Sequence, residues 1–138
     1  MIFDKNLQFS AAQALTATAA STNSVDLGAN RPVGPGETLW LVIVSKVDPG
    51  GTTPTLQPSI EADDNSGFSS VRTIETGPVL AAADFPAGTI FSMPWPMNLN
   101  EQYAQVRYTL TGTSPTFTVD AFLTNQDPTT WVSLPDAI

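Results

Sequence analysis

Two stretches near the C-terminus alternate apolar and polar residues, and they constrain the fold more than any other feature. In residues 103–110 the apolar positions are Ala104, Val106, Tyr108 and Leu110. In residues 116–124 they are Phe117, Val119, Ala121 and Leu123. A period of two places each set on one face of a β-strand, so both stretches are predicted to be half-buried strands.

The residues between these strands, Gly-Thr-Ser-Pro at 112–115, favour a turn that folds the two strands into a hairpin. On the outer face of that hairpin, Arg107 would lie opposite Asp120 as a structural charge pair. The same register leaves Phe122 exposed beside Gln105, on the face that also carries Tyr103. An exposed aromatic is either a lone surface residue or a contact with another chain. Phe122, Tyr103 and Gln105 are therefore interface candidates.

The rest of the chain also favours short strands. The run Leu-Trp-Leu-Val-Ile-Val at 39–44 is typical of a strand buried on both faces, and Asp-Pro-Gly-Gly at 48–51 would end it. Further strands are expected at 24–27, 56–61, 68–76 and 89–93, separated by turns rich in proline, glycine and aspartate. Helical conformation is conceivable at 10–20 and 78–83, although neither has a sustained apolar stripe.

This pattern predicts an all-β fold, a jelly roll or β-sandwich. We expect one domain over residues 1–138, without an internal repeat. The segment 1–23 is poor in bulky apolar residues and is expected as a possible extended arm ordered against a neighbouring chain.

The chain has no histidine and no cysteine, which removes the usual proton shuttle near neutral pH and the strongest common nucleophile. Its densest carboxylate group is Glu61, Asp63 and Asp64. Paired acids can hydrolyse glycosidic bonds, and acidic turns can bind calcium. Here the spacing fails the calcium-loop pattern, and aspartate and asparagine favour turns for local reasons, so a solvated turn is the preferred interpretation. No catalytic residue, metal or cofactor is expected.

The charge balance is acidic, with 13 Asp and Glu against 5 Lys and Arg, a net charge of -8. The scattered basic residues argue against nucleic-acid and anionic-membrane partners. Charged residues make up 13% of the chain, and a surface rich in neutral polar groups loses its water at low cost in a protein contact. The N-terminus lacks the apolar core of a signal peptide, so we expect a whole gene product made in a cytosol.

Two tryptophan positions are further interface candidates. Trp95 lies between two prolines and two methionines, Met93 and Met97, which together offer a stiff and adaptable apolar contact surface. Trp131 lies near the C-terminus and would anchor the tail or contact another chain. For both tryptophans the alternative is that the side chain packs into the domain's own core.

Three segments carry a resemblance to a known family. They are FDKNLQFSAAQALTATAASTNSVDLG at the start, GETLWLVIV in the middle and YAQVRYTLTGTSPTFTVDAFLTNQD near the end. Over nearly its whole length the chain resembles the capsid cement, or decoration, proteins of short-tailed bacteriophages of the Bordetella phage type. The resemblance implies a jelly-roll homo-oligomer, a dimer in preference to a trimer, on the outer surface of an icosahedral head. There it would clamp neighbouring major capsid protein subunits, and the family offers no catalytic residues to carry over.

Two other functions remain open from the sequence. A carbohydrate-binding jelly roll on the virion surface would present exposed aromatics over a sheet, as Tyr103 and Phe122 would on their predicted shared face. A glycosidase using Glu61 or Asp64 is the second alternative. The structural function is preferred because the chain is rich in strand patterns and poor in catalytic groups.

Overall fold

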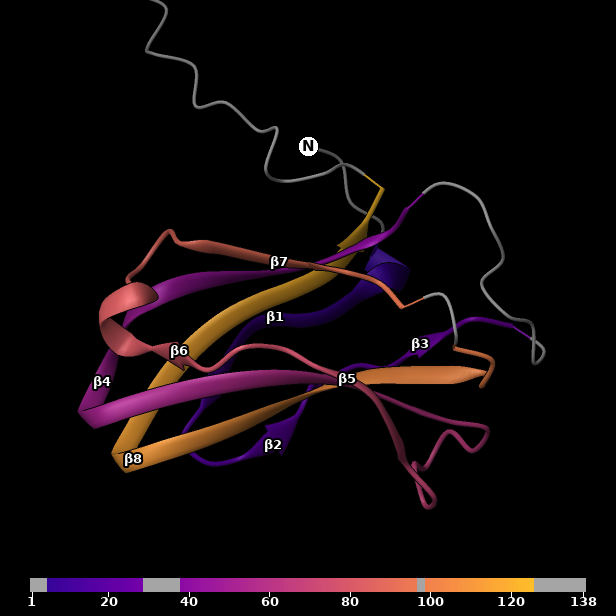
Figure 1. Ribbon diagram of the computed structural model, residues 1–138, viewed down its shortest axis with the longest axis horizontal. Helices are drawn as coiled ribbons and strands as arrows, with labels where there is room; N and C mark the ends of the chain where they lie inside the picture. Colours follow the sequence, from indigo (N-terminus) through magenta and orange to yellow (C-terminus); the bar gives the residue numbers. More distant parts are fainter. Residues whose placement is uncertain (1–4, 29–37, 97–98, 126–138) are drawn as a thin grey trace, which may run out of the picture.

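The computed structural model describes residues 5–28, 38–96 and 99–125. Within these residues there is no α-helix, and strands dominate (Figure 1). The elements, in chain order, are η1 (Lys5–Leu7), β1 (Gln8–Leu15), β2 (Ala19–Ala20), β3 (Val25–Asp26), β4 (Trp40–Asp63), β5 (Arg72–Thr76), β6 (Leu80–Ala81), η2 (Ala82–Asp84), β7 (Ile90–Pro94) and β8 (Tyr103–Thr124). The prediction of an all-β chain is confirmed.

Two long strands, β4 and β8, organise the fold. They pair antiparallel along nearly their whole length and bend together at one end of the molecule, on the left of Figure 1. Because both strands bend, each contributes one half to either of two layers. The first half of β4 and the last part of β8 lie side by side, between β7 and β1. The second half of β4 and the first part of β8 also lie side by side. They are flanked by β5 and β6 next to β4, and by β2 and β3 next to β8.

The resulting sandwich has two layers of four strand segments each. The layer order is β7-β4-β8-β1 in one layer, called the first layer here, and β5/β6-β4-β8-β2/β3 in the second layer. Eight segments in this double-layer order form a jelly roll, which confirms the predicted fold. Short and interrupted strands lie at the edges of both layers, which limits edge-to-edge association.

Among the described residues the core lies between the layers and is mostly apolar, and a polar bridge crosses it. Inward-facing side chains come from alternate positions of both long strands, as with Leu41 and Ile43 in β4 and Val119 and Ala121 in β8. The phenol of Tyr108 in the second layer is hydrogen-bonded to the hydroxyl of Ser10 in the first layer, with 2.7 Å between the oxygens. Both residues are 0% exposed. Burial raises the pKa of the Tyr108 phenol because the charged form would lose its water.

The corner where the long strands bend contains four residues with positive φ. Gly51 and Thr53 in β4 have φ of 108° and 46°, and Gly112 and Ser114 in β8 have φ of 105° and 49°. The register between the strands shifts repeatedly here and pairs Thr52 with Thr113. Residues 51–55 read Gly-Thr-Thr-Pro-Thr, and residues 112–116 read Gly-Thr-Ser-Pro-Thr. The corner is thus built from two pentapeptides that differ only at the third position, Thr53 against Ser114, a short repeat that the sequence analysis missed.

The predicted hairpin between 103–110 and 116–124 is wrong. Both stretches are halves of the continuous strand β8, and each half pairs with β4 instead of with the other half. Residues 112–115 bend the strand without reversing it. The Asp-Pro-Gly-Gly sequence at 48–51 likewise bends β4 and does not end it. The predicted inward faces are confirmed, because Val106, Tyr108, Phe117 and Val119 are all buried.

The N-terminal segment is part of the sandwich, which corrects the expectation of an arm over residues 1–23 where the structure describes them. β1 pairs with the last part of β8, and Phe9 and Leu15 lie in the core. The stretch 10–20 is therefore not helical: it contains most of β1, a bend at 16–18 and β2. Small residues dominate this segment, and its buried bulky side chains are those of Phe9 and Leu15. Two apolar positions are too few for the hydrophobic periodicity to reveal a strand. The strands expected at 24–27, 56–61 and 89–93 are confirmed, and that at 68–76 is shortened to β5.

Candidate interaction surfaces

The outer face of the first layer carries several apolar side chains. Val42 and Phe122 are cross-strand partners with 0% and 3% exposure, yet they lie outside the core cluster, on the opposite face of the layer. Val44 follows on the same face, beside its partner Ile90, which is 47% exposed. Val47, near the corner, is 55% exposed. The burial of Phe122 corrects the prediction that its side chain is exposed.

The three interface candidates from the predicted hairpin do not form one surface. Phe122 belongs to the first layer, where it pairs with Val42 and Gln8. Tyr103 and Gln105 belong to the second layer, where they pair with Asp63 and Glu61. The shared face was a consequence of the hairpin register, and it disappears because the two halves of β8 lie in different layers.

The outer face of the second layer carries a polar cluster. Glu61 accepts hydrogen bonds from Arg107 Nε at 2.8 Å and from Gln105 Nε2 at 2.8 Å, one on each carboxylate oxygen. Glu61 and Gln105 are 6% and 7% exposed, whereas the Arg107 side chain keeps 37% of its surface in solvent. A buried carboxylate is stable only when it is paired and hydrogen-bonded, and this one is both. Both carboxylate oxygens of Glu61 are therefore used in hydrogen bonds that connect β4 to β8.

The predicted pair of Arg107 and Asp120 is not formed. Arg107 binds Glu61, and Asp120 lies in the other layer, where one oxygen is 3.4 Å from Lys46 Nζ. The second oxygen of Asp120 accepts a hydrogen bond from the backbone N–H of Ala12 at 2.6 Å, at the bulge of β1.

The tryptophan and methionine candidates divide between the core and the undescribed part of the chain. Trp95 and Met93 are 3% and 6% exposed and lie in the core cluster, so they are not surface contacts. The Trp95 ring stacks on Phe9 with 5.9 Å between ring centroids, and its Nε1 has no hydrogen-bond partner among the described residues. Met97 and Trp131 lie outside the described residues.

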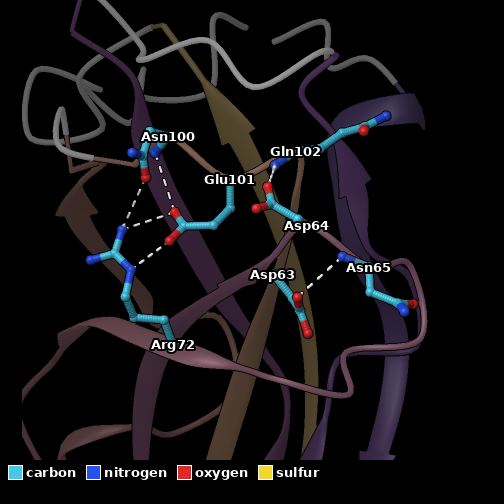
Figure 2. A network of polar contacts seen from close by, with 7 residues as sticks. All are labelled: Asp63, Asp64, Asn65, Arg72, Asn100, Glu101 and Gln102. Carbon is cyan, nitrogen blue, oxygen red and sulfur yellow. Dashed lines mark hydrogen bonds and ion pairs between the residues drawn. The ribbon is translucent and has the colours of Figure 1, made fainter.

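The acidic turn after β4 is held by its own carboxylates (Figure 2). Asp63 Oδ1 accepts the N–H of Asn65 at 3.1 Å, and Asp63 Oδ2 accepts the N–H of Ser70 at 2.7 Å. Asp64 Oδ1 accepts the N–H of Gln102 at 3.3 Å and so connects the turn to the start of β8. The turn expected around Asp63 and Asp64 is confirmed, and the carboxylates of both residues accept hydrogen bonds from backbone donors.

An ion pair between Arg72 and Glu101 lies at the same end of the sandwich. The Arg72 guanidinium is bidentate on the Glu101 carboxylate, with Nη2 2.8 Å from Oε2, and Nη2 is also 3.4 Å from Asn100 Oδ1 (Figure 2). The hydrogen bond from Arg72 lowers the pKa of Glu101 below its ordinary value. The Arg72 side chain is 48% exposed, so solvent screens the attraction.

Most of the acidic side chains in the described residues accept hydrogen bonds within the fold. Among the described residues no group of three or more acidic side chains could hold a metal ion. A shallow polar depression beside β3 is lined by Lys5, Gln8 and Asp26 together with small polar residues. The carboxylates proposed for a glycosidase, Glu61 and Asp64, are both hydrogen-bonded within the fold.

The exposed corner is the surface that sequence reasoning missed. Thr52, Thr53, Thr113 and Ser114 are all exposed. The signal that could have revealed it is the repeated Gly-Thr-Thr/Ser-Pro-Thr sequence, 61 positions apart in the two longest strands, from Gly51 and from Gly112.

The family model described as Bbp16 matches residues 9–123, which is nearly the whole sandwich from β1 to β8. The chain therefore belongs to the Bbp16 family, whose name is that of a Bordetella phage protein. No match is found among curated proteins. In the described residues no helix is long and apolar enough to cross a membrane.

Proposed function

From its membership of the Bbp16 family we propose that the chain is a structural virion protein that binds the outer surface of an icosahedral phage head. In this function it stabilises contacts between major capsid protein subunits as a capsid cement, or decoration, protein. The observation that carries the proposal is the family match over residues 9–123, which spans the sandwich and not one local motif.

The chemistry of the surface is consistent with this function. A net charge of -8 keeps a free protein soluble before it meets its partner, and it disfavours contact with packaged nucleic acid. The carboxylates of Glu61, Asp63 and Asp64 accept hydrogen bonds within the fold, and exposed neutral hydroxyls such as those of Thr52 and Thr113 are available for contacts. Many copies on one repeated surface would add stability to the particle through binding to the assembled state.

Two parts of the proposal come from the sequence alone. One is association into a homo-oligomer, with a dimer favoured. The other is the absence of enzymatic activity. The alternative of a carbohydrate-binding module loses its main support, because Tyr103 and Phe122 lie in different layers and Phe122 is buried.

A binding experiment tests the proposal. Purified protein is mixed with phage heads that lack it, the heads are sedimented, and their disruption temperature is measured. We expect co-sedimentation that saturates at a fixed copy number and a raised disruption temperature. Free capsid subunits serve as the control and should bind far less. Absence of binding to heads at micromolar protein would refute the proposed function.

A further inference from the structure

The corner of the sandwich, residues 50–55 and 111–116, has exposed side chains and none that is charged. Residues 50–55 and 111–116 contain no ionisable side chain, although the chain carries a net charge of -8. Thr52, Thr53, Thr113 and Ser114 are all exposed there. Neutral hydroxyls are desolvated at lower cost than charges, so this surface can enter a protein contact cheaply.

The backbone at this corner is strained at two positions that are not glycine. Thr53 and Ser114 have φ of 46° and 49°, in the left-handed region that side chains with a Cβ rarely adopt. A β-branched threonine is especially disfavoured there, and glycine would relieve the strain. Neither hydroxyl makes a hydrogen bond to any described residue. The fold itself therefore gives no reason for a hydroxyl-bearing side chain at either position, and strain of this kind gathers at functional sites.

The corner is also held in one geometry before any partner binds. The N–H of Gly50 donates to Thr116 Oγ1 at 3.0 Å, and the hydroxyls of Thr55 and Thr111 are hydrogen-bonded to each other. Next to the corner, Asp48 Oδ1 accepts the N–H of Ala87 at 2.8 Å. A surface ordered in advance loses little conformational entropy when it binds.

An exposed apolar side chain borders the hydroxyls. Val47 lies three residues before Gly50 in β4 and is 55% exposed. Its cross-strand partner Thr118 also faces outward. A small apolar anchor beside neutral hydroxyls is the composition of a protein-protein contact. The corner residues include no aromatic side chain on which a sugar ring could stack.

We propose that this corner, with Thr53, Ser114 and Val47, is the surface through which the protein contacts the head. Its partner is a neutral protein surface with hydrogen-bonding groups and a small apolar depression that receives Val47. This inference rests on the proposed function and adds to it the part of the molecule that makes the contact.

The test separates binding from stability. The variant T53G/S114G removes both hydroxyls and relieves both strained positions. We expect its melting temperature to equal or exceed that of the unaltered protein, while its affinity for heads falls about ten-fold or more. A loss of affinity without a loss of stability is a result that a purely structural role would not give. Val47→Ser is expected to weaken binding as well.

The matched control is Ala12→Gly. Ala12 also has a left-handed φ, 47°, and is exposed, but it lies in β1 away from the corner. This variant should gain stability in the same way and bind heads normally. If T53G/S114G and Val47→Ser bind as well as the unaltered protein, the inference is wrong and the proposed function stands. If the unaltered protein fails to bind heads, the proposed function itself is wrong.

Discussion

Gly51 and Gly112 each pack against carbonyl oxygens of the other's strand at the corner of the sandwich. A Cβ atom on Gly51 would lie 2.5 Å from the carbonyl oxygen of Ser114, and one on Gly112 would lie 2.7 Å from that of Thr53. Both glycines have φ above 100°. Two equivalent glycines therefore allow two long strands to bend at the same place, and the bend creates both layers.

Alanine at either corner glycine should destabilise the protein strongly. We expect Gly51→Ala or Gly112→Ala to cost about 3 kcal/mol of unfolding free energy or more, because left-handed strain adds to a clash with backbone. Denaturant unfolding measures the cost. Gly88→Ala is the control, since Gly88 has φ of 88° but no atom within 4 Å of the added Cβ. It should lose only about 1 kcal/mol, and equal losses at all three positions would contradict the packing argument.

Removing the cation beside Glu61 should also destabilise the fold. Arg107→Met leaves a carboxylate that is 6% exposed with Gln105 as its remaining side-chain donor. Because Arg107 is partly exposed, we expect a loss of about 1–2 kcal/mol, below the cost of breaking a fully buried pair. Lys46→Met, which removes the exposed partner of Asp120, should change stability by less than about 0.5 kcal/mol. Comparable effects of the two variants would show that burial of Glu61 is unimportant.

The pair of Arg72 and Glu101 should make stability depend on acid pH. The folded protein holds the pKa of Glu101 below the ordinary value of 4.5. Its contribution is therefore present above that value and is lost as the pH falls through the lower, folded pKa. Glu101→Gln should remove this component of the pH dependence between about pH 5 and 3. An unchanged pH profile of unfolding in this variant would contradict the assignment.

Tyr108 should make stability depend on alkaline pH in the opposite sense. Burial raises its pKa above the ordinary value of 10.0. The unfolded phenol ionises first, so its contribution is complete below pH 10 and is lost as the pH rises above that value. Tyr108→Phe should remove that loss and, through the hydrogen bond to Ser10, cost about 1 kcal/mol at neutral pH. Tyr103→Phe, at a partly exposed position, is the control and should cost less at neutral pH.

The sequence predicted which residues face the core more successfully than which strands pair. Alternation in 103–110 and 116–124 fixes the inward faces, because the side-chain period of a strand is two whatever its partner. The same pattern cannot distinguish a hairpin from one bent strand. That choice depends on the long-range pairing of both halves with β4, in which Thr52 meets Thr113.

Errors in the candidate interface residues follow from this single difference. Phe122 and Tyr103 share a face only in the hairpin register, so neither the aromatic surface nor the pair of Arg107 and Asp120 survives in the structure. The corner was missed for another reason. Thr53 and Ser114 are recognisable as unusual only from their left-handed backbone conformation, and a sequence does not show the φ angle.

A reconstruction of the phage head, with and without this protein, tests the proposed function most directly. The difference between the two maps should show sandwich-shaped density on the outer surface, bridging neighbouring capsid subunits and touching them through the corner at Thr53 and Ser114. Identical maps, or added density inside the shell or on the tail alone, would contradict a capsid cement function.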